Sequence, residues 1–340
     1  MDARGKYDFI QFIRGIAALM VLLEHLWPFA RDILKYDSKL LDIFTAEIFN
    51  IGQIAVVLFF VITGFLVPWS CYEKSAKDFI IGRLFRIYPV YIVSILGLSI
   101  IAALLGRKYS AVEILANLTL FQMYMGIENI NGASWVLPID IIFYILCVVF
   151  KKYLRNTHIV LVGFYLMCAG TLGAAFLRGR MQRKLPVAIL LLCTVAVLGY
   201  ILRLYHEKRI EGNKVKVVVS IFFLVTFISA VTAYNFDTGL GEHWYTYFIS
   251  YTLATAFFIY LYKRQYHTSS QMILFVSKIS YSLFLMHPVA FELFQIYKEG
   301  YIRSIFLVIC ISAAFTLAGI SYYLIEAPCR KLLYLTKHYW

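Results

Sequence analysis

The first apolar segment of the chain carries residues that could do acid–base chemistry inside a membrane. Within residues 9–28, Arg14 and His25 are eleven positions apart, which at ~100° per residue places them on one helix face, ~16 Å apart along the axis. That face would hold a fixed cation toward one end and an imidazole that titrates near neutral pH toward the other. Glu24 would point about 100° away from His25, so we expect the partner that orients the imidazole to come from another segment.

A second pattern places two guanidinium groups side by side. In GRLFRIYP, residues 82–89, Arg83 and Arg86 are three positions apart and share a helix face, and Pro89 limits how that helix continues. Each guanidinium offers planar paired donors that suit a phosphate group. The alternative is that both cations only anchor a helix end at the membrane surface.

Two further ionisable residues fall inside apolar runs. Asp140 lies within SWVLPIDIIFY, residues 134–144, and a buried carboxylate there needs a cation or an imidazole as its partner. His287 lies within SYSLFLMHPVAFE, residues 280–292. We rank it below His25, because a histidine is more often a satisfied interior residue than a catalyst. Each of these residues costs free energy in a membrane, so each belongs either to a functional site or to a structural ion pair.

The composition shows which elements must position these residues. Hydrophobic residues make up 61% of the 340 residues and charged residues only 15%, well below the roughly 25% of a globular protein. A soluble chain could not cover so much apolar surface with so little charge, and a disulfide scaffold, a disordered chain and a coiled coil are excluded as well. We expect an all-α, polytopic transmembrane bundle of about ten spans, forming a single domain over residues 1–340. The expected spans are residues 9–28, 47–70, 87–105, 135–150, 158–177, 185–202, 217–234, 244–262, 272–290 and 304–325.

One apolar stretch and the six cysteines need a separate interpretation. Residues 112–125 are too short to span a bilayer and contain Glu113, Asn117 and Gln122, which favours an interfacial or re-entrant segment. The first span is not expected to be a cleaved signal peptide, because it carries Arg14, Glu24 and His25. The cysteines lie in apolar runs or at span ends without metal-ligand spacing, so we expect reduced, small hydrophobic residues and no metal site.

Basic residues are distributed unevenly between the two sets of connecting segments, and the net charge of the chain is +13. An N-terminus in the cytoplasm assigns 20 Lys and Arg residues to cytoplasmic segments and 11 to the opposite side. This bias favours both termini in the cytoplasm. The basic run at residues 178–184 contradicts the bias. The cytoplasmic segments in this assignment are residues 1–8, 71–86, 151–157, 203–216, 263–278 and 329–340.

Six pieces of the chain, in order, resemble the acyltransferase-3 family of integral membrane acyltransferases, which O-acylate sugars of bacterial surface polymers. FIQFIRGIAALMVLLEH is similar to the opening helix of that family, with its recurring Arg-Gly and His, and GQIAVVLFFVITGFLV is similar to its second span. GRLFRIYP matches the paired-Arg motif, and SWVLPIDIIFY resembles a stretch that usually has Glu where this chain has Asp140. SYSLFLMHP and YYLIEAPCRKL resemble the last two motifs. Among the branches of the family, the exopolysaccharide and capsule acetyltransferases are the most similar.

The resemblance implies roles for individual residues. His25 would be the catalytic base, and Asp140 would support it in the catalytic site. Arg14, Arg83 and Arg86 would hold the cytoplasmic acyl-CoA donor. The change from Glu to Asp at position 140 shortens the side chain by one methylene but keeps the carboxylate.

The residues and the resemblance together predict an O-acetyltransferase of the cell envelope. It would move an acyl group, expected to be acetyl, from acyl-CoA (acetyl-CoA) as co-substrate to a hydroxyl of a cell-surface polysaccharide or lipid-linked sugar. We expect a multi-pass protein of the inner (plasma) membrane that contacts membrane lipid and binds no nucleic acid, and we leave a homo-oligomer open.

Two other functions fit the same spans. A polysaccharide transporter or flippase would also carry ionisable residues inside the membrane, but the chain lacks the internal symmetry expected of one, and thioester cleavage would distinguish the two. A non-catalytic membrane partner of a glycan-synthesis complex would tolerate loss of His25 and Arg86 together, which an enzyme would not.

Overall fold

The computed structural model describes residues 7–34, 38–183, 185–235, 243–268, 270–295 and 303–336. All regular secondary structure in these ranges is helical. The long helices are α1 (Asp8–Leu34), α3 (Ile51–Glu73), α4 (Ala76–Leu104), α6 (Leu137–Val149), α7 (Thr157–Met181), α8 (Val187–His206), α9 (Gly212–Ala233), α10 (Trp244–Arg264), α11 (Gln271–Gln295), α12 (Arg303–Ser321) and α13 (Ala327–Thr336). Shorter ones are α2 (Lys39–Asp42), η1 (Ile43–Glu47), α5 (Ala111–Leu118), η2 (Gln122–Met125), η3 (Gly132–Val136), η4 (Lys151–Tyr153) and η5 (Tyr322–Glu326).

Nine helical segments of the described chain are long and apolar enough to cross a membrane. The expected polytopic helical bundle is therefore confirmed. The tenth expected span, residues 244–262, forms α10, whose 21 residues are long enough to cross but include five tyrosines, so this helix is more polar than the other nine. Residues 112–125 form α5 and η2 rather than a span, as expected.

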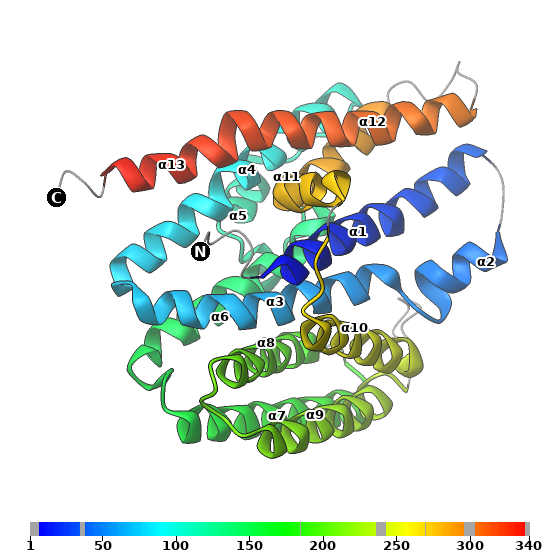
Figure 1. Ribbon diagram of the computed structural model, residues 1–340. Coiled ribbons are helices and arrows are strands. Elements are labelled where there is room, and N and C mark those ends of the chain that lie inside the picture. Colours follow the sequence, from blue (N-terminus) through cyan, green and yellow to red (C-terminus); the bar gives the residue numbers. More distant parts are fainter. Residues whose placement is uncertain are drawn as a thin grey trace.

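Helices α1 and α3 run side by side through the middle of the bundle (Figure 1). On one side, α11 packs against α1, and α4 and α12 pack against α11. On the other side, α8 and α10 pack against α3, and α7 and α9 complete a second group of helices. The residues that α1 and α3 present to each other, and to α11 and α4, therefore lie at the centre of the molecule.

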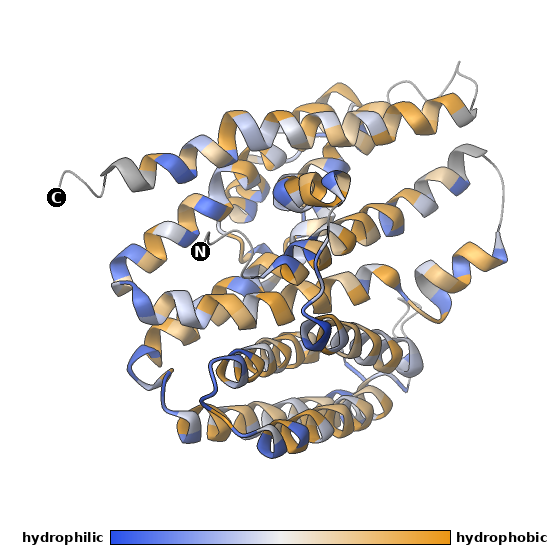
Figure 2. Ribbon diagram, in the orientation of Figure 1, coloured by the Kyte–Doolittle hydropathy of each residue, from blue (hydrophilic) through white to orange (hydrophobic). Residues whose placement is uncertain are grey.

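Apolar side chains cover both the interior and much of the outer surface. Figure 2 shows hydrophobic residues along most helices and hydrophilic residues gathered at helix ends and in connecting segments. On α7, the large side chains of Val162, Leu166, Phe176 and Leu177 are more than half exposed. Such an outward apolar face suits contact with lipid rather than with water.

Close contact between α3 and α8 depends on two glycines. A Cβ atom at Gly64 would overlap the carbonyl of Ala196, and one at Gly199 would overlap the carbonyl of Val61. Small residues allow helix backbones to approach in this way inside membranes. The contact fixes α3, which carries part of the site described below, against the second group of helices.

The basic connecting segments meet at one end of the bundle. His267, which follows α10, lies 3.0 Å from the carboxylate of Asp8 at the start of α1. Lys151, which follows α6, donates to the carbonyl of Lys74, which follows α3. The connecting segments that we expect on the cytoplasmic side thus lie at one end of the structure. Which side of the membrane this end faces in a cell stays a prediction. Residues 236–242 and 337–340, which belong to that prediction, lie outside the described residues.

Within the basic run at residues 178–184, Arg178 is buried, whereas Arg180 and Arg183 are exposed. Arg178 and Arg180 belong to the last turn of α7 rather than to a loop. Arg178 is 6% exposed, and its guanidinium carbon lies 4.3 Å from the ring centroid of Tyr234. A cation held inside the bundle on an aromatic face is not a surface charge that would determine sidedness. Lys184 lies outside the described residues.

Candidate functional site

Arg14, Arg86 and Asp140 line one cavity of about 110 Å³, which we call the arginine cavity. The three residues come from α1, α4 and α6, which are far apart in sequence. Nη2 of Arg14 donates to Oγ of Ser280 on α11 at 3.0 Å, which fixes the guanidinium at the cavity wall. The structure therefore brings together two of the three expected donor-binding arginines.

Asp140 belongs to the arginine cavity and not to the surroundings of His25. Its side chain is positioned by the first turn of α6, which begins with Leu137 and Pro138. Oδ1 has no hydrogen-bond partner among the described residues, and the charges that act on the carboxylate most strongly are those of Arg86 and Arg83. The arrangement suits a counter-charge that orients a guanidinium more than it suits proton transfer at the imidazole.

Arg83 lies on the other side of a tyrosine ring from this cavity. Its guanidinium carbon is 5.2 Å from the ring centroids of both Phe79 and Tyr144. Tyr144 also lines the arginine cavity, whereas Arg83 lines a neighbouring apolar pocket. The two guanidiniums that share a helix face in the sequence are thus separated by Tyr144, and only Arg86 faces the cavity.

A buried carboxylate near Arg14 was not identified from the sequence as a site residue. Glu326 is 1% exposed, accepts a hydrogen bond from Ser282 at 2.8 Å and pairs with Arg330 at 3.5 Å. Its charge acts on Arg14 as well. The available signal was a charged residue at the end of an apolar helix, in the sequence IEAP.

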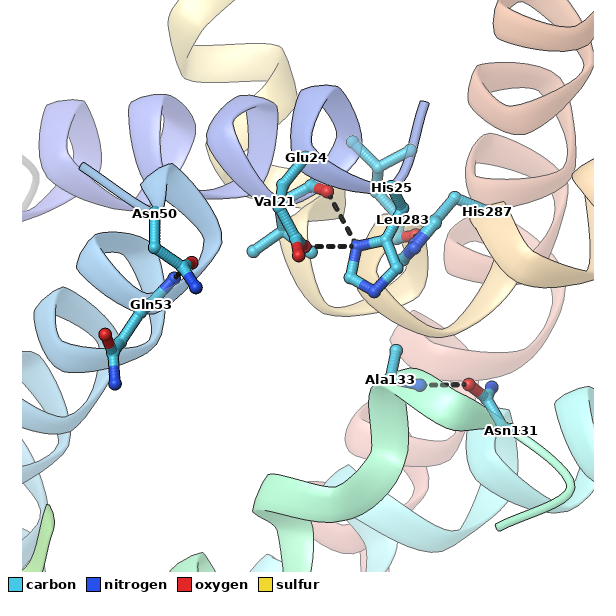
Figure 3. Close-up of polar contacts among 9 residues, drawn as sticks. All are labelled: Val21, Glu24, His25, Asn50, Gln53, Asn131, Ala133, Leu283 and His287. Atoms are coloured by element: carbon cyan, nitrogen blue, oxygen red, sulfur yellow. Dashed lines mark hydrogen bonds and ion pairs between the residues drawn. The ribbon is translucent and has the colours of Figure 1, made fainter. Parts of the chain in front are cut away.

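His25 lies near the other end of α1 and is held by two acceptors. Nδ1 is 3.0 Å from the carbonyl oxygen of Val21 and 2.8 Å from Oε2 of Glu24 (Figure 3). Since both neighbours accept, Nδ1 carries a hydrogen, and in the neutral imidazole Nε2 keeps its lone pair. The imidazole is therefore arranged to accept a proton at Nε2.

The expectation that the partner orienting His25 comes from another segment is wrong, because Glu24 of the same helix binds its Nδ1. The helical rule describes the directions of Cβ atoms, and those of neighbouring residues do diverge by about 100°. The Glu side chain has three rotatable bonds, however, and its carboxylate folds back across the helix to the imidazole. Gly52 of α3 leaves room for this, because a Cβ atom there would lie 2.6 Å from Oε2 of Glu24.

His287 of α11 contacts His25 from another helix, but through its ring and without a hydrogen bond that would orient the imidazole. The two imidazole ring centroids are 4.9 Å apart, with the rings inclined by 59°. His287 is 1% exposed, and its Nδ1 is 3.0 Å from the carbonyl oxygen of Leu283. Its Nε2 has no hydrogen-bond partner in the described part of the chain. The structure thus places a second imidazole beside the candidate base.

His25 and Glu24 line a second cavity, of about 230 Å³, which we call the imidazole cavity. Figure 3 shows Asn50, which caps the start of α3, and Gln53 of α3 across the open space from the imidazole. Oε1 of Gln53 has no partner among the described residues. Aromatic rings complete the wall, from Trp135, Tyr247 and Tyr251. Amide groups and aromatic faces together provide the hydrogen bonds and apolar contact that a polar ring-shaped ligand needs.

A hydrogen-bonded asparagine holds the wall segment that carries Trp135. Asn131 is fully buried, and its Nδ2 donates to the carbonyl oxygen of Leu285 at 3.1 Å and to Oγ of Ser94 at 3.2 Å. Its Oδ1 accepts from the backbone of Ala133 at 3.1 Å (Figure 3). Irregular backbone such as the segment around Asn131 is tolerated inside a membrane protein where its polar groups form hydrogen bonds within the protein.

The two cavities adjoin. Val56 of α3 and Phe284 of α11 line both of them. Arg14 lines one cavity and His25 the other, on the helix face that these two residues share. In the described ranges, no group of three or more His, Cys, Asp or Glu residues could hold a metal ion. The six cysteines are free.

The chain matches a known protein family over nearly its whole length. The family model Acyl_transf_3, described as an acyltransferase domain, matches residues 7–324. The chain is 29% identical over 162 residues to an O-acetyl transferase of Shigella phage Sf6, and the match covers 42% of this chain. It spans 45% of the length of that curated relative. No solved structure matches the chain.

Proposed function

Since the chain belongs to the acyltransferase-3 family, as its six pieces of sequence predict, we propose that it is a membrane O-acetyltransferase. It moves an acetyl group from acetyl-CoA to a hydroxyl of a cell-surface polysaccharide or a lipid-linked sugar. The observation that carries this proposal is the pair of adjoining cavities, one lined by Arg14 and Arg86 and the other by His25.

The arginine cavity is the donor end of the site. Guanidinium groups bind phosphate oxygens through paired donors, and coenzyme A carries a pyrophosphate and a further phosphate. Arg14 and Arg86 hold the phosphate-bearing end, and the nearby carboxylates of Asp140 and Glu326 balance part of their positive charge. The basic end of the bundle then faces the cytoplasm, where acyl-CoA is available, in an inner (plasma) membrane.

The imidazole cavity is the acceptor end. A sugar ring stacks on the aromatic side chains, and Asn50 and Gln53 bind its hydroxyls. The reacting hydroxyl donates its proton to Nε2 of His25 as its oxygen attacks the carbonyl carbon of the thioester. The carbon–sulfur bond breaks, and coenzyme A leaves as a thiolate that takes up the proton from the imidazolium. Glu24 stabilises the imidazolium between these two steps.

The proposal is tested with purified protein in lipid nanodiscs, acetyl-CoA labelled in the acetyl group, and a soluble methyl pyranoside as acceptor probe. We expect labelled pyranoside to form with the parent protein and to be lost in His25→Gln. A transporter or a non-catalytic partner would leave the thioester intact in both. Mass spectrometry of surface glycans from cells with and without the gene then identifies the natural acceptor by a difference of one acetyl group.

A further inference from the structure

Two side chains, those of Val56 and Phe284, line both cavities, and we call them the partition between the cavities. Val56 is 9% exposed, and Phe284 is half-buried, with part of its surface open to the cavities. They come from α3 and α11, the two helices that pack against α1 on either side of the Arg14–His25 face. Anything that reaches from Arg14 to His25 along this face passes between Val56 and Phe284.

Phe284 lies directly beside the reacting groups. It is three residues before His287, so the two side chains share one face of α11, and the His287 ring is in contact with His25. The backbone at this point is fixed, because the carbonyl oxygen of Leu285 accepts a hydrogen bond from buried Asn131. The phenyl ring therefore has a defined position between the phosphate-binding groups and the imidazole.

We propose that Phe284 determines which acyl group is transferred, by limiting the room for an acyl chain at the partition. This inference rests on the proposed function. When the thioester carbonyl reaches Nε2 of His25, its acyl chain must share the end of the imidazole cavity with the acceptor. That cavity measures about 230 Å³, and the phenyl ring forms its wall toward the donor. Acetyl fits, and each added methylene meets the ring.

The same ring separates the thioester from water before the acceptor binds. With a smaller side chain, water can reach the carbonyl carbon. Its oxygen then forms the new bond, the carbon–sulfur bond breaks, and acetate and the free thiol of coenzyme A are produced. Hydrolysis of acetyl-CoA without an acceptor is therefore a second, independent measure of what Phe284 does.

The test compares Phe284→Ala with Phe223→Ala, using acetyl-CoA, butyryl-CoA and hexanoyl-CoA as donors. Phe223 of α9 is the matched control, because it is also half-buried but lines neither the arginine cavity nor the imidazole cavity. Because one methylene in an apolar pocket changes kcat/KM by roughly 10–200-fold, we expect the butyryl-to-acetyl ratio to rise at least tenfold in Phe284→Ala. Acceptor-free hydrolysis rises as well, and Phe223→Ala changes neither quantity.

Two further variants keep the test decisive if Phe284→Ala folds poorly. Phe284→Leu should shift the ratio in the same direction by less, and Phe284→Trp should lower it below that of the parent. An unchanged ratio in an active, folded Phe284→Ala or Phe284→Leu, or an equal shift in Phe223→Ala, overturns the role of Phe284 and leaves the proposed function standing. A parent protein that transfers no acyl group from any of the three donors overturns both.

Discussion

Oε2 of Glu24 lies 2.8 Å from Nδ1 of His25, although the two residues are neighbours on one helix. Gly52 leaves room for the carboxylate, because a Cβ atom there would come within 2.6 Å of the same oxygen. Glu24 of α1 and Gly52 of α3 thus act together on the tautomer and the direction of the imidazole. Because the carboxylate also favours the protonated imidazole, it assists the step in which His25 holds a proton.

Removing the charge of Glu24 should slow the chemical step without weakening donor binding. A hydrogen bond to a charged group contributes about 1.5–3 kcal/mol, so Glu24→Gln should lower kcat by about ten- to hundredfold, with KM for acetyl-CoA unchanged. The pH profile should change too, because the imidazole loses a neighbouring anion. Steady-state kinetics between pH 5 and 9 measure both effects. A Glu24→Gln variant with parental kcat and pH profile would show that the carboxylate only packs.

Gly52→Ala tests the same relationship without touching either partner. The added methyl group displaces the Glu24 carboxylate from His25, so this variant should reproduce the kinetics of Glu24→Gln. Gly173→Ala is the control, because it places the same methyl group inside α7 with no atom within 4 Å. If both glycine variants lose the same activity, the loss comes from a general effect on the helices.

The composition and the motifs were sufficient to predict the bundle and the Arg14–His25 face, because both depend on local periodicity. They could not show that Tyr144 separates Arg83 from Arg86, since that depends on how α6 packs against α4. The sequence also could not place Asp140 in the arginine cavity, away from His25, because that position too depends on how α6 packs. Cβ directions alone made Glu24 a poor candidate to orient His25, and the sequence could not show that Gly52 of the facing helix leaves room for the Glu24 carboxylate beside the imidazole.

The separation of the two arginines predicts different consequences of their substitution. Arg86→Lys keeps the positive charge but loses the paired donors. The apparent KM for acetyl-CoA should rise by about tenfold or more, because the variant loses the binding free energy of one charge-assisted hydrogen bond. Arg83→Lys should raise it less, because Arg83 faces Phe79 and Tyr144 rather than the cavity. Initial rates against acetyl-CoA concentration give both values. Parental KM in both variants would favour two cations that only anchor the helix end.

Both termini are predicted to face the cytoplasm, on the distribution of basic residues. A single cysteine at Lys208, in the exposed connection between α8 and α9, should be protected from an impermeant maleimide added outside sealed, right-side-out vesicles. One at Thr238, outside the described residues, should react. Five of the native cysteines are buried and Cys329 is half-buried, so Cys329→Ser gives a suitable background. The opposite labelling pattern would place the arginine cavity on the side without acyl-CoA and would exclude its role as donor site.

His25 is predicted to be the catalytic base, so its substitution should nearly abolish acetyl transfer without unfolding the protein. General bases contribute about 10²–10⁴-fold, so His25→Gln and His25→Ala should remain folded, bind acetyl-CoA and transfer at most about a hundredth of the parental rate. The parental rate should also fall as the pH drops through the imidazole pKa, because protonated Nε2 cannot accept the hydroxyl proton. Purified variants, compared by size-exclusion chromatography, acetyl-CoA binding and transfer of labelled acetyl, supply the measurement. If His25→Gln keeps more than about a tenth of parental turnover, well above what loss of a base allows, the proton acceptor is another group, with adjacent His287 first and Asp140 second.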